Sequence, residues 1–74
     1  MSKLPALSGK VIIKALKNMG VEEIRIKGSH HFLKHHDNRC TVVPVHSGET
    51  IGKGLLSQIL KDCEISLEDL LKQL

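Results

Sequence analysis

Residues 24–45, IRIKGSHHFLKHHDNRCTVVPV, specify the sheet because two turn signals divide them into strand-like segments. Ile24 and Ile26 alternate with basic residues, which indicates a half-buried strand with both isoleucines on one face. Gly28-Ser29 breaks that strand, and Asp37-Asn38 is a good turn signal further along. Alternation and β-branched residues therefore predict three strands, over residues 21–27, 30–36 and 40–45.

Helical patterns lie on both sides of this stretch. Before it, Ser8 is a suitable N-cap, apolar residues recur at helical spacing, and Gly20 supplies a left-handed C-cap. After it, two apolar rows and a capping-box-like start at Ser66 predict two further helices. The predicted helices cover residues 8–19, 51–63 and 66–74. Pro44 cannot donate to a strand ladder, so we place it at an edge or at a strand end.

The element order α-β-β-β-α-α predicts an α+β fold. A three-stranded antiparallel sheet with helices packed on one face is the simplest way to bury both patterns. The 74 residues make a single domain, 1–74. A chain of this length buries only about 60% of its unfolded surface, so binding a partner adds appreciably to its stability.

The sequence also indicates a compartment. It has no signal-peptide pattern, and no apolar run approaches the ~20 residues that a membrane span needs. Cys40 and Cys63 are lone thiols without CxxC spacing, which we interpret as reduced and mostly buried. We therefore expect a soluble, cytoplasmic protein that does not contact a membrane.

The charge favours a polyanionic partner without requiring one. The formal net charge is +3, and protonation of all five histidines would raise it to +8 (3 + 5). Phe32 is the single aromatic ring among Phe, Tyr and Trp. This argues against a platform on which many bases of a single strand stack.

Clustered histidines suggest a metal site, but their spacing does not favour one. On a strand, His30 and His31 point to opposite faces, while His31 and His35 stand roughly 13 Å apart at ~3.3 Å per residue. Ligand nitrogens must converge to within about 2.1 Å of one zinc ion. There is also no cluster of carboxylates for Mg²⁺. We predict neither a metal nor a cofactor.

Acid–base chemistry suits these residues better. RNA carries its own nucleophile, the 2′-hydroxyl, so a histidine base, nearby cations and an acid are enough to cleave it. Glycine at Gly28 would let a phosphate approach the backbone closely. A two-residue turn at Asp37-Asn38 would place Ser29 opposite His46 and Lys34 on the face of His30. The alternative is that the histidines are ordinary polar strand residues.

A row of lysines repeats along the first helix, at Lys10, Lys14 and Lys17. These residues are spaced so that they share one face, roughly opposite the apolar stripe. The row is either a solvated helix face or a set of cations that contacts RNA phosphates.

The motif Gly28-Ser29-His30-His31 followed by Val43-Pro44-Val45-His46 resembles the HicA (YcfA-like) toxin family. The resemblance covers nearly the whole chain. It includes a first helix ending at Met19-Gly20, the Pro-x-His exit and the Gly54-x-x-x-x-Ile59-Leu60 helix. Each piece alone is weak, whereas their order and spacing together are fairly specific.

This resemblance implies a fold like the double-stranded-RNA-binding domain, α-β-β-β-α, with an extra C-terminal helix. It also implies metal-independent mRNA cleavage, and neutralisation by a HicB antitoxin that covers the active site. The family's histidine follows the Gly-Ser pair, which puts the catalytic role on His30, with His31 as its rival and His46 as a candidate partner. The predicted RNA contacts are Lys27, Gly28, Ser29, Lys34, Lys10, Lys14 and Lys17.

Three classes of function stay open on the sequence. The first is an endoribonuclease toxin, which the convergent histidines favour. The second is a non-catalytic RNA-binding module of the same fold, since reading the shape of duplex RNA needs cations but no such histidines. The third is a structural or protein-binding adaptor, which would leave the histidine cluster unexplained.

Overall fold

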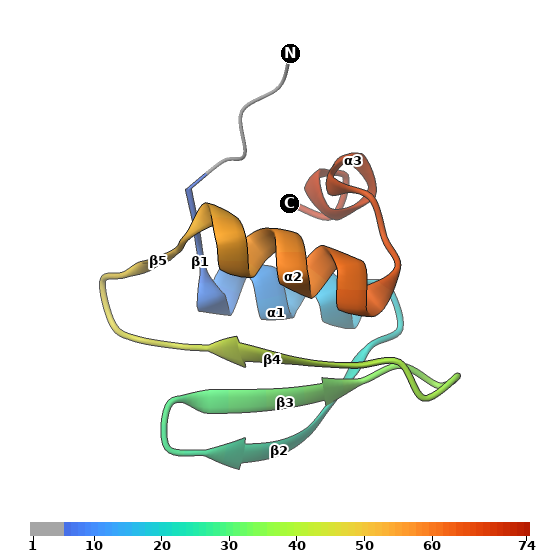
Figure 1. Ribbon diagram of the computed structural model, residues 1–74, viewed down its shortest axis with the longest axis horizontal. Helices are drawn as coiled ribbons and strands as arrows, with labels where there is room; N and C mark the ends of the chain where they lie inside the picture. Colours follow the sequence, from blue (N-terminus) through green and yellow to red (C-terminus); the bar gives the residue numbers. More distant parts are fainter. Residues whose placement is uncertain (1–5) are drawn as a thin grey trace.

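A computed structural model describes residues 6–74 of the chain (Figure 1). Three helices and five strands follow one another in the order β1, α1, β2, β3, β4, β5, α2, α3. Their bounds are β1 Leu7–Ser8, α1 Gly9–Asn18, β2 Glu22–Lys27, β3 His30–Lys34, β4 Cys40–Pro44, β5 Thr50–Ile51, α2 Lys53–Cys63 and α3 Leu67–Leu71. Within residues 6–74, no helix has the length and apolarity to cross a membrane.

The main sheet is antiparallel, with the strand order β2-β3-β4. Helices α1 and α2 lie on the same side of this sheet, and α3 packs against α1 (Figure 1). Strands β1 and β5 form a separate two-stranded ribbon. The predicted α+β class and the three-stranded antiparallel meander are therefore confirmed, and the arrangement agrees with the α-β-β-β-α order.

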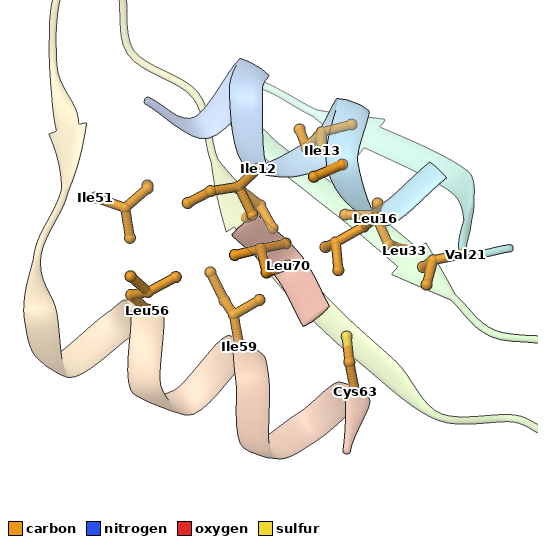
Figure 2. Close-up of a cluster of buried hydrophobic side chains, with 12 residues drawn as sticks. Ile12, Ile13, Leu16, Val21, Leu33, Ile51, Leu56, Ile59, Cys63 and Leu70 are labelled. Atoms are coloured by element: carbon orange, nitrogen blue, oxygen red, sulfur yellow. The ribbon is translucent and has the colours of Figure 1, made fainter. Parts of the chain in front are cut away.

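The core fills the space between the helices and the inner face of the sheet (Figure 2). Ile12 and Leu16 of α1 meet Leu56 and Ile59 of α2 there, and Leu70 of α3 reaches the same cluster. The sheet contributes Leu33 and Val43, both fully buried. Because the sheet faces helices on one side only, Thr41 and Val43 alternate with less buried residues in β4, and Leu33 is the buried residue of β3.

Three helix caps are those that the sequence predicts: Ser8, Gly20 and Ser66. The Ser8 hydroxyl accepts a hydrogen bond from the Val11 amide at 3.3 Å, and the Ser66 hydroxyl accepts one from the Asp69 amide at 3.0 Å. At the end of α1, Gly20 has φ 91° and the Val21 amide donates to the Leu16 carbonyl at 3.0 Å. This is a Schellman ending, in which the left-handed glycine turns the chain toward β2.

The turn between β3 and β4 differs from the prediction by one residue. The Asn38 amide donates to the His35 carbonyl, and the His35 amide donates to the Arg39 carbonyl. These two hydrogen bonds close a three-residue loop. Asn38 has φ 75°, the left-handed position that ends such a loop and that asparagine tolerates. The longer loop shifts the register, so the Val45 amide donates to the Ser29 carbonyl at 2.7 Å. Ser29 therefore faces Val45, and the predicted pairing of Ser29 with His46 is wrong.

Strand β2 departs from simple alternation. Glu23 pairs with Leu33 and Arg25 pairs with Phe32, so Ile24 is the extra residue of a β-bulge. The bulge separates the two isoleucines that alternation puts on one face: Ile26 pairs with His31, whereas Ile24 lies on the outer face. Ile24 is 57% exposed and Ile26 is 56% exposed. The prediction of a half-buried strand is wrong because β2 is an edge strand that the helices barely cover.

Other boundaries also moved. Ile51 belongs to β5 and helix α2 begins two residues later, at Lys53, after a glycine N-cap. Ile51 is still buried, because β5 pairs with β1 beside the core. Pro44 ends β4, an edge strand, as predicted. Cys63 is buried as predicted, but Cys40 is exposed because it faces outward at the start of β4.

Candidate active site

Neighbouring histidines on β3 face opposite sides of the sheet. His31 has the same parity as the buried Leu33 and therefore points toward the helices, while His30 points to the outer face with Phe32. His30 is exposed, and it lies opposite Lys27 on one side and Pro44 on the other. The two rival histidines of the sequence thus lie in different environments.

His31 forms a pair with Glu23 of the neighbouring strand. The His31 Nδ1 contacts the Glu23 carboxylate, and both side chains are largely covered, at 20% and 19% exposure. The hydrogen bond from His31, supported by Lys17, lowers the pKa of Glu23 against the opposing effect of desolvation. A carboxylate held on Nδ1 fixes the orientation of an imidazole ring and leaves Nε2 to meet a substrate.

Glu23 is a residue that sequence reasoning missed. Without the bulge at Ile24, Glu23 would pair with Lys34 and face outward; with it, Glu23 pairs with Leu33 and shares the face of His31. A bulge inserts one residue and reverses the side-chain alternation beyond it. The sequence around Ile24 contains no glycine that would signal such a bulge.

The lysine row of α1 lies beside this pair. Lys17 Nζ is 3.5 Å from a Glu23 carboxylate oxygen. Lys14 and Lys10 lie one and two turns earlier in the helix. Of the residues the structure describes, none offers a carboxylate within ion-pair distance of Lys10 or Lys14. The three lysines and the His31–Glu23 pair line a groove of about 440 Å³. Its full lining is Lys10, Ile13, Lys14, Lys17, Glu23, His31 and Val45.

His46 lies next to this groove and not in it. It follows Val45 at the exit of β4 and lines a second hollow of about 350 Å³. Lys10 and Val45 line both spaces, so the two are neighbours. The lining of this second hollow, which we call the His46 hollow, consists of Ser8, Gly9, Lys10, Val45, His46, Ser47 and Gly48.

Gly9 holds α1 in this position, and no sequence pattern indicates its importance. A Cβ built on Gly9 would lie 2.4 Å from the Pro44 carbonyl oxygen, a clash with rigid backbone. Only glycine allows the first turn of α1 to approach the end of β4 so closely. That approach brings Lys10 beside Val45 and His46.

The remaining predicted residues lie elsewhere. Gly28 has φ 60° at the first central position of the tight β2–β3 turn, with Ser29 after it. Lys27 and His30 form a cross-strand pair beside this turn, and Lys34 pairs with Glu22 on the outer face. The structure therefore brings His31 together with the lysine row, and separates His30 and Lys34 from both.

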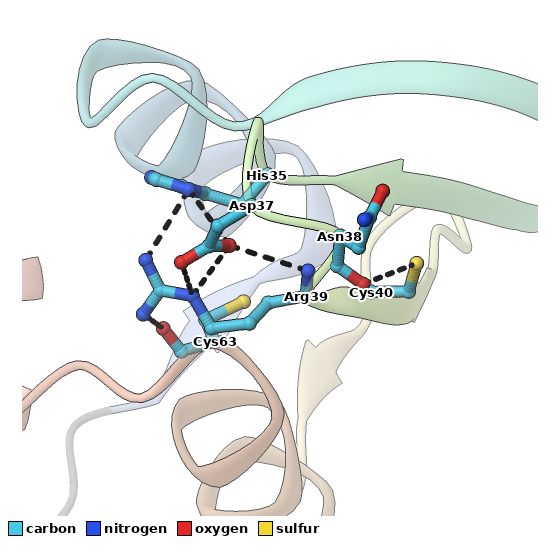
Figure 3. A network of polar contacts seen from close by, with 6 residues as sticks. All are labelled: His35, Asp37, Asn38, Arg39, Cys40 and Cys63. Carbon is cyan, nitrogen blue, oxygen red and sulfur yellow. Dashed lines mark hydrogen bonds and ion pairs between the residues drawn. The ribbon is translucent and has the colours of Figure 1, made fainter.

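His35 belongs to a structural network at the far end of β3 (Figure 3). The Arg39 guanidinium donates to the Asp37 carboxylate at 2.8 Å, to the Cys63 carbonyl at 2.6 Å and to His35 Nδ1 at 3.2 Å. The bond to Arg39 lowers the pKa of Asp37 from 3.8 to about 2. These contacts tie the β3–β4 turn to the end of α2 and leave His35 no role in the groove.

The groove has the groups that acid–base cleavage of a phosphodiester needs: an oriented imidazole and several cations. Within residues 6–74, no three histidine, cysteine or acidic side chains converge to form a metal-binding cluster.

Comparison with known proteins identifies the family. None of the curated proteins matches the chain. A family model for the HicA toxin of bacterial toxin–antitoxin systems matches residues 9–65, from the first residue of α1 to just beyond the end of α2. The matched segment includes His31, the lysine row and His46. The chain belongs to the HicA family of toxins.

Proposed function

We propose that this toxin is an endoribonuclease that cleaves mRNA without a metal ion, and that His31 rather than His30 is its catalytic histidine. One observation carries the proposal: the His31–Glu23 pair lies in a groove bordered by Lys10, Lys14 and Lys17. His30 has neither a carboxylate partner among the described residues nor a place in that groove.

The chemistry follows from the groups in the groove. His31 accepts the proton of a ribose 2′-hydroxyl, and the 2′-oxygen forms a bond to the adjacent phosphorus. The phosphorane gains negative charge, which the lysine ammonium groups stabilise. The bond from phosphorus to the 5′-oxygen then breaks, and that oxygen takes a proton from solvent. The products are a 2′,3′-cyclic phosphate and a 5′-hydroxyl, and no step requires a metal.

Glu23 acts in this proposal as a positioning residue. Its carboxylate holds Nδ1 of His31, so Nε2 is the nitrogen presented to the substrate. As His31 takes up the proton, the negative charge of Glu23 stabilises the imidazolium that forms.

The partner of a toxin of this family is an antitoxin. We propose that it is a HicB-type protein that covers the groove, because the exposed ammonium groups of Lys10 and Lys14 favour a partner with carboxylates at that place. The target, mRNA, and the cytoplasm as the place of action belong to the same proposal.

The test is cleavage of a long RNA in EDTA by the wild type, His31→Ala and His30→Ala. His30→Ala is the matched control, since it removes the neighbouring imidazole from the other face of the same strand. We expect cleavage by the wild type and by His30→Ala, and a loss of at least 100-fold in His31→Ala. Full activity in a folded His31→Ala protein would refute the assignment. Restoration of activity by a divalent ion after EDTA would refute the metal-free mechanism.

A second measurement addresses the nucleophile. Substituting deoxyribose at the cleaved position removes the 2′-hydroxyl and should abolish cleavage there without weakening binding. Products that carry a 5′-phosphate would show that water, not the 2′-hydroxyl, attacks the phosphorus.

The lysine row also supports a second candidate, a non-catalytic RNA-binding module. Such a module would bind RNA with strong salt dependence. It would leave long RNA intact, and His31→Ala would bind as well as the wild type.

A further inference from the structure

We infer that the His46 hollow is a subsite that holds one nucleobase of single-stranded RNA beside the phosphate on which His31 acts. The inference rests on the proposed function and deepens it. It assigns His46 a role in binding, in place of the proton transfer suggested by its position in the sequence.

The position of the His46 hollow supports this role. The His46 hollow lies next to the groove of His31, since Lys10 and Val45 line both. Val45 directly precedes His46 in the chain. Its amide donates to the Ser29 carbonyl just beyond the end of the β3–β4 pairing. In this proposal, a phosphate of the RNA strand lies against Lys10 in the groove and the adjacent nucleoside lies in the His46 hollow.

The chemistry of the lining suits a nucleobase. His46 is exposed, and among the described side chains none forms a hydrogen bond or ion pair with its imidazole. Phe32 lies on the outer face of the sheet, so the His46 ring is the flat surface available beside Lys10. Splayed bases of single-stranded RNA stack on histidine rings as they do on other aromatic side chains.

The fold holds both walls of this hollow in place. Gly9 fits against the Pro44 carbonyl and fixes one wall. The Glu49 amide donates to the His46 carbonyl at 3.1 Å, and Gly48 turns the chain with φ 75°, which together fix the other. A base inside a duplex is already stacked on its neighbours and cannot enter such a space, so the subsite selects unpaired RNA.

The experiment uses short 2′-O-methyl oligonucleotides that contain one ribonucleotide, so that only one position can be cleaved. Two further versions have an abasic residue on either side of that position. Single-turnover cleavage is measured for the wild type, His46→Ala, His46→Phe and His36→Ala, with affinities measured by fluorescence anisotropy in a His31→Ala background. His36 is the control because it is an exposed histidine that lines neither the groove of His31 nor the His46 hollow.

For His46→Ala we expect about a tenfold loss of affinity with the cleavage rate at saturation little changed. His46→Phe should recover the affinity, because a phenyl ring stacks but cannot transfer a proton. An abasic residue on one side should weaken binding to the wild type about tenfold and have no further effect in His46→Ala.

Three results would overturn the subsite. Loss of the saturating rate in both His46→Ala and His46→Phe would make His46 a proton-transfer group. Equal affinities in all His46 variants would show that no base rests there. Equal losses of affinity from the two abasic positions would also show that no base rests in the His46 hollow. Failure of the wild type to cleave would count against the proposed function alone, since the affinities are measured in a protein that needs no catalysis.

Discussion

At the scale of single residues, one step along β3 separates two environments. His30 lies in solvent beside Lys27, while His31 is largely covered and contacts Glu23. The pairing depends on the bulge at Ile24, since that extra residue turns the Glu23 side chain inward. The proposed active site therefore depends on a backbone irregularity that contributes no side chain to it.

Substituting Glu23→Gln tests the positioning role. The amide keeps the size of the side chain but no longer stabilises an imidazolium, so we expect the rate of RNA cleavage to fall by about 10- to 1000-fold with little change in RNA affinity. Single-turnover kinetics measure the rate. Glu22→Gln on the outer face is the matched control. An unchanged rate in Glu23→Gln would remove Glu23 from the mechanism.

The pKa of Asp37 provides a test of the Arg39 network. Because its folded pKa is lowered from 3.8 to about 2, its contribution to stability is present above pH 4 and is lost as the pH falls toward 2. Asp37→Asn lacks that titration. We expect its melting temperature to be below that of the wild type at neutral pH, with the difference shrinking between pH 4 and pH 2. A constant difference over this range would show that the ion pair with Arg39 does not stabilise the fold.

At the scale of the elements, two helices end in the same way with different residues. In α1 the left-handed position is occupied by Gly20; after α2 it is occupied by Glu64, with φ 55°. The Ile65 amide donates to the Leu60 carbonyl at 3.1 Å, as in a Schellman ending. A side chain with a Cβ is strained in this conformation.

We therefore expect Glu64→Gly to raise the free energy of unfolding by about 1 kcal/mol, which corresponds to a rise of about 4–8 °C in melting temperature. Thermal denaturation followed by circular dichroism measures it. Glu64→Ala removes the same carboxylate but keeps Cβ, so it should give no comparable gain. Equal stabilisation by alanine and glycine would attribute the effect to charge rather than to backbone strain.

At the scale of the whole molecule, the sheet has two different surfaces. The helix side carries the groove with the lysine row, and the outer side carries Arg25 over the Phe32 ring at 5.9 Å, with Lys34 nearby. The net charge of +3 does not distinguish these surfaces. Their separation by a full layer of the fold means that RNA contacts on the two sides can be measured independently.

The salt dependence of RNA binding tests which side is used. Replacing Lys10, Lys14 and Lys17 by glutamine should reduce the slope of log K against log salt by about 2, at about 0.7 for each lost phosphate contact with a single strand. Replacing Lys53, Lys61 and Lys72 removes the same charge away from the groove and should leave the slope nearly unchanged. Equal changes in the two triple variants would indicate a diffuse charge effect rather than a defined binding face.

Local sequence patterns specify the class of fold, the family, and the order of the three helices and the three strands of the main sheet, but they do not reveal the short strands β1 and β5. Capping residues such as Ser8, Gly20 and Ser66 act through hydrogen bonds to neighbours a few residues away, so the local sequence contains the information. Apolar spacing in the same way specifies which helix face is buried. The candidate histidines and the lysine row were also visible, because residue type alone indicates acid–base chemistry and phosphate contacts.

Which of these residues meet depends on packing between distant parts of the chain. The bulge at Ile24 and the three-residue turn ending at Asn38 each shift the register by one position, and one position moves a strand side chain to the other face. These shifts bring Glu23 to His31 and remove Ser29 from His46. The approach of α1 to β4, which only Gly9 allows, sets the lysines beside His31. Such choices depend on packing between segments far apart in the chain, and local patterns of sequence do not contain them.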